Sequence, residues 1–229
     1  MQGLFTHVHD ATIRTLGVNG YDVREVPGQV CCGALHAHAG LVDEARALAR
    51  ANVAAFGGDE PIVVNSAGCG ALMKEYGRLL DEPEGERFAA RVRDVTELLA
   101  ASGPLPAAPL DLHVAYDPPC HLLHAQGVAL PPLKLFAAIP LLQLVQVPGA
   151  AECCGSAGLF TLLEPEMSRA VLAAKLERLR EAAPQVVATG NPGCLMQIGA
   201  GLAAAGIPAA VRHPVELLDA AYRAAGRYE

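Results

Sequence analysis

Short apolar runs alternate with longer amphipathic stretches along the whole chain. Runs rich in Val, Leu and Ile predict strands at 21–26, 61–65, 112–116, 141–147, 185–189 and 209–212. Apolar residues at helical spacing predict helices at about 7–17, 34–56, 68–80, 86–101, 165–182, 194–205 and 214–225. Strands that alternate with helices are typical of parallel α/β layers. We therefore expect the α/β class, with short, mostly parallel sheets flanked by helices.

The same sequence pattern occurs twice. The first copy reads GQVCCGALHAHAG and then VNSAGCGALMKEYG, and the second reads AECCGSAGLF and then TGNPGCLMQIGAGL. The single cysteine follows the cysteine pair after 37 residues in the first copy (Cys32 to Cys69) and after 40 in the second (Cys154 to Cys194). The pattern predicts two tandem repeated units, residues 1–105 and 106–229, joined by the segment SGPLPAAP.

The second unit carries one element that the first lacks. Asp117-Pro-Pro-Cys120-His121 places Cys120 33 residues before Cys153, and the same offset from Cys31 falls just upstream of Met1. We therefore expect the first unit to be clipped at its N-terminus, by truncation of the chain or by a start codon at an internal position.

Composition and charge exclude several classes of protein. With 52% hydrophobic and 18% charged residues, the chain can bury a core, and disorder is excluded. A net charge of −7 without a basic stripe argues against a nucleic-acid partner. The uncharged stretch 182–211 contains three prolines and five glycines, so it cannot form a spanning helix. Because the N-terminus does not resemble a signal peptide either, we expect a cytoplasmic protein without a transmembrane segment.

Seven cysteines are the main chemical signal. Their number is odd and no export signal is evident, so metal ligation, redox chemistry or inert buried thiols are more plausible than structural disulfides. Each cysteine follows a predicted strand, and the carboxyl ends of parallel strands meet at one edge of a sheet. The candidate ligands are Cys120, Cys153, Cys154 and Cys194 in the second unit and Cys31, Cys32 and Cys69 in the first. Four thiolates suit an iron–sulfur cluster or a structural zinc ion, and adjacent cysteines fit two neighbouring irons better than one ion.

Other polar residues give weaker signals. Gly33 and Gly155 follow the two cysteine pairs, where positive φ or a close backbone approach favours glycine. We interpret the histidines near the cysteines as packing residues rather than ligands; they are His36, His38, His121 and His124. Lys74 and Arg212 are candidate cations near the site or ordinary solvated side chains. Nucleotide-binding and hydrolase motifs are absent from the sequence, so we expect neither a nucleotide cofactor nor a catalytic residue.

These motifs resemble a known family over nearly the whole chain. The two Cys-Cys-Gly units look like the cysteine-rich CCG domains that occur in tandem in one of the subunits of heterodisulfide reductase. The segments CCGALHAHAG, NSAGCGALMKEYG, DPPCHLLHAQG, CCGSAGLF, NPGCLMQIGAGL and HPVELLDAAYR are most similar to the C-terminal half of glycolate oxidase iron–sulfur subunits. The lactate utilisation iron–sulfur subunit, a tandem CCG pair of similar length, is the next best fit.

The resemblance implies an electron-transfer subunit rather than the catalytic chain. Flavoprotein partners would oxidise a 2-hydroxy acid, glycolate by preference, and pass electrons through iron–sulfur centres to an acceptor such as quinone, in the cytoplasm or at the inner face of the membrane. The seven cysteines would be the ligands in the two units.

Three departures from the family pattern determine how many clusters we expect and where. The ferredoxin-like N-terminal half of that subunit is missing from this chain, and the first unit has only three thiols. Ser66 and Asn191 stand where the fullest pattern has the first Cys of a C-x-x-C pair. We therefore expect one [4Fe–4S] cluster in the second unit, with a second one possible in the first. A zinc-bound scaffold subunit and a thiol–disulfide enzyme using Cys153 and Cys154 are the alternatives.

Overall fold

The computed structural model describes residues 3–228. The first half of the chain forms α1 (Thr6–Val18), α2 (Ala34–His38), α3 (Val42–Ala55), β1 (Ile62–Val64), α4 (Ala67–Lys74), α5 (Tyr76–Leu80), α6 (Pro83–Arg91), β2 (Val92–Asp94) and α7 (Val95–Ser102). The second half forms β3 (Leu112–Tyr116), the π-helix η1 (His121–Ala125), α8 (Leu130–Ala137), β4 (Leu142–Val145), α9 (Phe160–Leu163), α10 (Pro165–Ala182), β5 (Val186–Ala188), α11 (Pro192–Ala204), β6 (Ala210–Arg212) and α12 (Pro214–Ala224).

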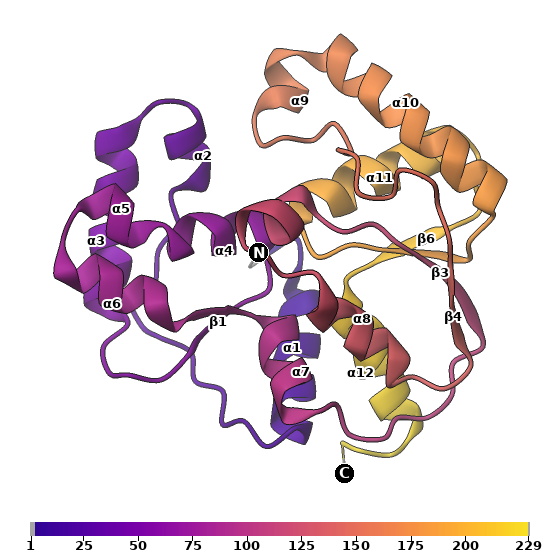
Figure 1. The fold of residues 1–229 in the computed structure, drawn as a ribbon, viewed down its shortest axis with the longest axis horizontal. Coiled ribbons are helices and arrows are strands. Elements are labelled where there is room, and N and C mark those ends of the chain that lie inside the picture. The colour runs from indigo at the N-terminus through magenta and orange to yellow at the C-terminus, as the bar shows by residue number, and fades with distance from the viewer. Residues whose placement is uncertain (1–2, 229) are drawn as a thin grey trace.

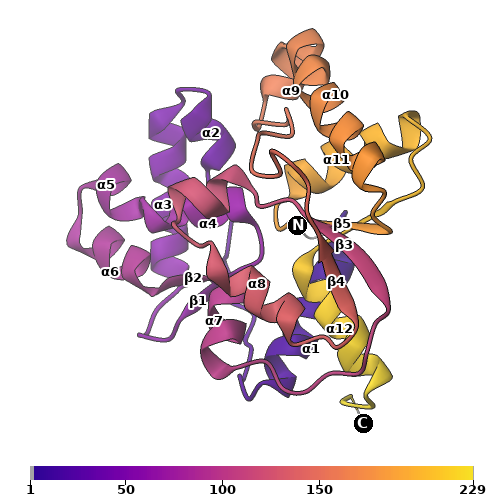
Figure 2. The same cartoon turned by 45° about the vertical axis from the view of Figure 1, so that its right-hand side comes forward.

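Every described strand pairs with its neighbours in parallel. The first unit has the two-stranded sheet β1-β2, and the second has the four-stranded sheet β4-β3-β5-β6 (Figure 1 and Figure 2). Parallel strands need long crossover connections, and helices supply them here. The expected α/β class with short parallel sheets is confirmed. All strands of a sheet consequently end at the same edge, and the segments that bear Cys69, Cys120, Cys153, Cys154 and Cys194 follow strands there.

The repeat is visible in corresponding elements. The pair β1-β2 matches β5-β6, with α4 after β1 and α11 after β5. The helix that follows β2 or β6, α7 or α12, begins with a capping box, formed by Asp94 with Glu97 and by His213 with Glu216. The two units therefore share the local chemistry that starts their last helix.

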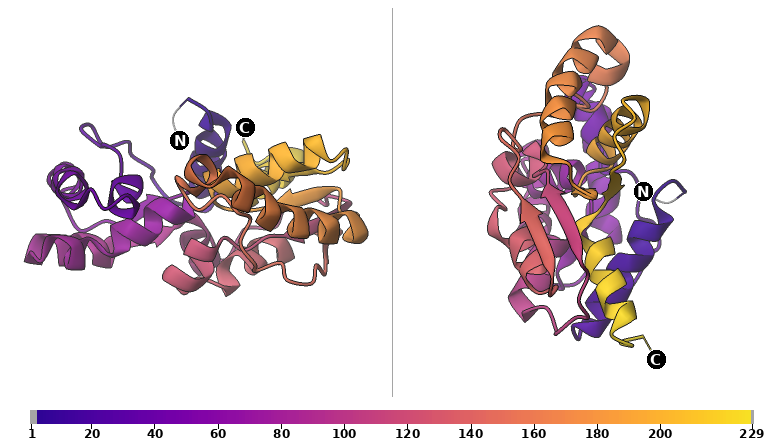
Figure 3. Two further views of the ribbon diagram at one scale, coloured as in Figure 1. Left: turned by 90° about the horizontal axis from the view of Figure 1, so that it is seen from above. Right: turned by 90° about the vertical axis from the view of Figure 1, so that its right-hand side faces the viewer.

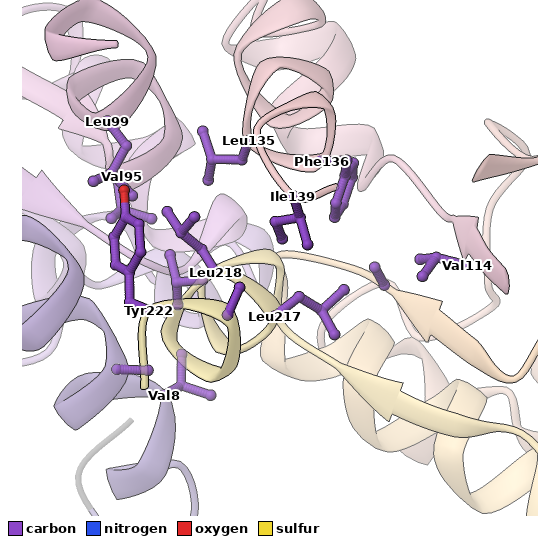
Figure 4. Packing of buried hydrophobic residues seen from close by; sticks show 14 of the residues in the cluster. Val8, Val95, Leu99, Val114, Leu135, Phe136, Ile139, Leu217, Leu218 and Tyr222 are labelled. Carbon is purple, nitrogen blue, oxygen red and sulfur yellow. The ribbon is translucent and has the colours of Figure 1, made fainter. Parts of the chain in front are cut away.

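The main core is built by both units together. Helix α1 packs against α12, as the indigo and yellow helices of Figure 3 show, and α7 packs against α8. Each contact joins a helix of one unit to a helix of the other. The buried side chains at this junction come from α1, α7, α8, β3 and α12; among them are Val8, Val95, Leu99, Val114, Leu135, Phe136, Leu218 and Tyr222 (Figure 4). Because this core crosses residue 105, the boundary between 1–105 and 106–229 stays a prediction drawn from the repeated sequence.

The predicted strand at 21–26 is wrong. This segment is irregular, whereas the corresponding strand of the second unit, β4, pairs with β3. Among the described residues, β1 pairs only with β2, and no strand lies beside 21–26. A strand without a partner leaves its backbone groups unpaired, so β propensity alone does not form one.

Several predicted helices are interrupted. The range 34–56 splits into α2 and α3 at Gly40, whose φ is 77°. The range 68–80 splits into α4 and α5, and 86–101 contains the strand β2. The short helices η1, α8 and α9 were not predicted. None of the described helices combines the length and apolar character needed to cross a bilayer.

Candidate metal centre

The four cysteines of the second unit lie at the carboxyl ends of three neighbouring strands. Cys120 follows β3 at the start of η1, Cys153 and Cys154 lie in the connection after β4, and Cys194 lies in the first turn of α11 after β5. One cavity is lined by all four, so the expected convergence of distant cysteines is observed. The parallel order of β4, β3 and β5 explains it, because these strands end side by side.

The thiols contact one another in a chain. The Sγ atoms of Cys154 and Cys194 are 3.3 Å apart. Cys153 lies within hydrogen-bonding reach of both Cys120 and Cys154. Cys153 is exposed, Cys120 is half-buried, and Cys154 and Cys194 are buried. The four sulfur atoms thus extend from the surface into the interior.

Hydrogen bonds between these sulfurs shift their pKa values in opposite directions. Hydrogen bonds from Cys120 and Cys154, helped by the Gly155 N–H, lower the pKa of Cys153 well below its usual range. A hydrogen bond from Cys154 and one from the Asn191 amide lower the pKa of Cys194. The pKa values of the donors Cys120 and Cys154 are raised because they donate hydrogen bonds to Cys153 and Cys194 and because they are buried. The lowered pKa values of Cys153 and Cys194 favour their thiolate forms, which soft metals and thiol exchange both require.

The first unit brings together three thiols. Cys31 is exposed, Cys32 is buried, and Cys69 lies in the first turn of α4. A hydrogen bond from Cys32 lowers the pKa of Cys69, and that bond together with burial raises the pKa of Cys32. Within residues 3–228, no fourth cysteine joins this group.

The loop that bears each cysteine pair is fixed by buried polar side chains from the following helices. In the first unit, Asn52 donates to the Cys31 carbonyl oxygen (3.1 Å), and the Tyr76 hydroxyl donates to that of Cys32 (2.8 Å). In the second unit, Ser168 donates to the Gly155 carbonyl oxygen (2.8 Å). No pattern in the sequence marked these residues, since each is a single polar position in an amphipathic helix.

The glycine after each cysteine pair has the expected backbone. Gly33 and Gly155 both have φ of 84°, a left-handed conformation that L side chains adopt at a cost. A Cβ on Gly155 would lie 2.5 Å from the Ser168 carbonyl oxygen. Both the backbone conformation and the close approach therefore require glycine at this position.

The histidines pack at the junction of the two units. The ring of His38 on α2 stacks on that of His121 on η1, with centroids 5.6 Å apart. His121 also places Nδ1 3.7 Å from the Cys120 Sγ. His124 is exposed, and the buried Nδ1 of His36 has no hydrogen-bond partner in the described part of the chain. The first unit thus contributes α2 to the wall beside the second unit's cysteines.

The cation at the site is not one that the sequence singled out. Lys74 forms an ion pair with Glu97, and Arg212 donates to the Val211 carbonyl oxygen. The positive charge that helps to lower the pKa of Cys153 belongs to Lys175 on α10. Lys175 looked like an ordinary polar position of a helix, which is why the sequence did not reveal it.

The donor set determines which group the second unit can hold. Four thiol groups with N–H donors directed at Cys153 and Cys194 fit an iron–sulfur cluster, and sulfur donors also suit zinc. Among residues 3–228, no three His, Cys, Asp or Glu side chains are arranged as a site for a single metal ion. Adjacent Cys153 and Cys154 are suited to ligate neighbouring irons of one cluster. The residues present therefore fit a cluster of several irons.

Comparison with known proteins finds a matching domain family and several similar subunits. The model of the cysteine-rich domain family CCG matches residues 1–74 and 114–199. A probable glycolate oxidase iron–sulfur subunit of Bacillus subtilis is 35% identical over 99% of this chain and 53% of its own length. A fumarate reductase (CoM/CoB) subunit of Methanothermobacter marburgensis is 35% identical over 93% of this chain and 42% of its own. Lactate utilization protein A of Geobacillus kaustophilus is 30% identical over 94% of this chain and 93% of its own. The chain thus spans about half the length of the first two relatives and nearly all of the third.

Proposed function

Because the chain belongs to the cysteine-rich CCG domain family, we propose that it is an iron–sulfur electron-transfer subunit of a complex that oxidises a 2-hydroxy acid. One observation carries the proposal: four thiols from the ends of three parallel strands line one cavity. Their spacing and chemistry suit a cluster that accepts and releases single electrons. We assign the ligand role to Cys120, Cys153, Cys154 and Cys194 and expect one [4Fe–4S] cluster there.

The substrate of the complex is proposed to be glycolate. The support is the similarity to a relative named as a probable glycolate oxidase iron–sulfur subunit. Lactate is the second candidate, since lactate utilization protein A is similar over nearly the full length of both chains. In both cases the hydroxy acid is oxidised by a flavoprotein partner, because the flavin carries the hydride chemistry.

We propose that this chain works with a flavoprotein subunit and with a ferredoxin-like segment outside residues 1–229. The first unit's three thiols supply at most an incomplete second centre. Reduced thiols are needed to take up a cluster, so we place the protein in the reducing cytoplasm, at the inner face of the membrane where a quinone acceptor is accessible.

A redox titration tests this function. Protein purified without oxygen is reduced with a chemically reduced flavin and then reoxidised with a soluble quinone, while its visible absorbance is followed. We expect a broad absorbance that bleaches with about one electron per cluster and returns on reoxidation. Stoichiometric zinc, with no labile sulfide and no absorbance that responds to reduction, would contradict electron transfer and favour the scaffold alternative.

The thiol–disulfide alternative is tested by a separate assay of disulfide exchange. If Cys153 and Cys154 were a dithiol couple, they would exchange with a disulfide substrate after all metal is removed. We expect the metal-free protein to show no catalytic turnover with such a substrate. Sustained turnover by the metal-free protein, lost in Cys153→Ser, would replace the electron-transfer function with an oxidoreductase that acts through thiols.

A further inference from the structure

The second unit buries a complete ion pair beside its cysteines. Lys175 is one of only three lysines in the chain, and its side chain is 4% exposed. Its ammonium group pairs with the carboxylate of Asp117, whose side chain is 7% exposed. Lysine and aspartate are seldom buried to this extent, and burying them costs several kcal/mol per ion, about as much as the pair regains. The pair therefore adds little to the stability of the fold, and stability alone does not explain why it is buried.

The hydrogen bonds of this pair reach every segment of the second unit that carries a thiol. Lys175 Nζ also donates to the Ala150 carbonyl oxygen (2.9 Å), three residues before Cys153. Asp117 precedes Cys120 by three residues and accepts a hydrogen bond from the Thr189 hydroxyl (3.1 Å), five residues before Cys194. One buried pair thus joins the ends of β3 and β5 and the connection that follows β4.

The charges of the pair act on the sulfurs with opposite sign. Lys175 carries a positive charge and is hydrogen-bonded to the segment that bears Cys153, whereas Asp117 carries a negative charge and is hydrogen-bonded to the segment that bears Cys194. Both charges lie in a buried environment, where solvent screens them little. Any change in the charge of the four-sulfur site consequently changes its electrostatic interaction with Lys175 and Asp117.

We propose that Lys175 and Asp117 are positioning residues that hold the three thiol-bearing segments together and balance the electrostatic potential at the four-sulfur site. This rests on the proposed function in one respect, since the second role concerns electron uptake by the cluster. The first role concerns the segments themselves and holds with or without a cluster.

The positioning role is tested on the metal-free protein by amide hydrogen exchange. Lys175→Met is expected to speed exchange in all three segments, 117–121, 147–155 and 189–194, because the hydrogen bonds at Ala150 and Asp117 are lost. Lys134→Met, which changes an exposed lysine on α8, is the matched control and leaves exchange unaltered. Unchanged exchange at 147–155 in Lys175→Met would overturn the positioning role.

A second variant covers the case in which Lys175→Met does not fold. Replacing both partners, as in Lys175→Met with Asp117→Asn, removes the uncompensated buried charge and is expected to fold. It still lacks the bond to the Ala150 carbonyl oxygen, so exchange at 147–155 rises while the rest of the chain keeps its protection. Full protection of this segment in the double variant would also overturn the positioning role.

The electrostatic role is tested by the reduction potential of the loaded protein. Lys175→Met leaves a negative charge and is expected to lower the potential, whereas Asp117→Asn leaves a positive charge and raises it. The double variant returns close to the original value. The titration is repeated at several pH values from about 6 to 9, because burial favours the neutral form of a partner that is left alone. Shifts of the same sign in both single variants, or no shift at any pH, would overturn this role, because general damage to the site has no reason to change sign with charge.

The proposed cluster and the proposed role of the Lys175–Asp117 pair can be refuted independently. A wild-type protein that takes up no iron and sulfide refutes the proposed cluster, while the exchange experiment on the same protein still decides whether Lys175 holds the segments. A loaded wild type with normal redox behaviour, but without effects in the variants, refutes only the role of the pair.

Discussion

The sharpest constraint on a single residue is at Gly155. Its positive φ follows directly from the turn that presents Cys153 and Cys154, and its α-hydrogen faces the Ser168 carbonyl oxygen. A left-handed conformation costs an L residue about 1–2 kcal/mol, and a backbone clash adds to that cost. At Gly155, therefore, both the backbone conformation and the nearby carbonyl oxygen disfavour any side chain.

Gly155→Ala is accordingly expected to destabilise the protein by at least about 2 kcal/mol, as strain and clash add. Urea unfolding of the metal-free protein measures this loss. Gly206→Ala is the matched control, because Gly206 has φ of 63° but no atom lies within 4 Å of the added Cβ. The control isolates the conformational strain of about 1 kcal/mol. Equal losses for both variants would show that the contact with Ser168 is unimportant.

At the scale of elements, corresponding helices begin with different titratable residues. The N-cap of α7 is Asp94 and that of α12 is His213, both almost fully buried. Burial raises the pKa of Asp94 to about 6 and lowers the pKa of His213 to about 3. Both shifts disfavour the charged form, yet their effects on stability have opposite directions on acidification.

The histidine cap is expected to make the fold sensitive to acid. Below about pH 6.5 the unfolded chain binds a proton at His213 that the folded chain excludes, so stability falls by up to about 1.4 kcal/mol per pH unit. Burial of charged Asp94 costs stability above about pH 6, and this cost is relieved as the pH falls toward 4.

His213→Asn retains a good N-cap and removes this proton linkage. The free energy of unfolding, measured between about pH 7.5 and 5, should then fall less steeply than in the wild type or rise as Asp94 takes up its proton. His113→Asn, a change at an exposed position of β3, should keep the wild-type slope. The same slope in all three proteins would contradict the burial of a neutral His213.

The sequence predicted some elements well and others poorly for physical reasons. The helix at 165–182 and the strand at 112–116 have strong periodicity and clear boundaries, and the structure has both. The strand β2 has only three residues between two helices, too few for a period to show. The segment 21–26 has strand-like residues but no partner strand, and pairing is a property of distant segments.

The same limit applies to the site. Convergence of the cysteines was predictable, because parallel strands that each end in a cysteine must bring them to one edge. The supporting residues were not, since Lys175 and Asp117 are 58 residues apart and their contact depends on how α10 lies against the sheet. Local patterns carry no information about such long-range polar contacts.

At the scale of the whole molecule, the two units share one large hydrophobic cluster, and each also has a smaller cluster of its own. Leu218 on α12 is fully buried in the cluster to which α1 and α7 of the first unit contribute (Figure 4). On the polar side of the same junction, Arg14 donates two hydrogen bonds to the Asp219 carboxylate (2.8 and 2.9 Å). Loss of packing on α12 should therefore weaken both units.

Leu218→Ala is expected to cost about 2–5 kcal/mol by leaving a cavity. Hydrogen exchange, followed separately for β1 and β5, should accelerate in both strands because they belong to one cooperative structure. Faster exchange in β5 with an unchanged rate in β1 would mean that the units unfold independently.

We propose that the second unit, rather than the first, holds the cluster. The most direct test is iron and labile sulfide per chain in oxygen-free wild type, Cys194→Ser and Cys69→Ser, two variants that each remove the cysteine in the first turn of the corresponding helix. We expect about four irons and four sulfides in the wild type, a loss of nearly all of both in Cys194→Ser, and retention in Cys69→Ser. Equal losses in both variants, or zinc in place of iron and sulfide, would contradict the account.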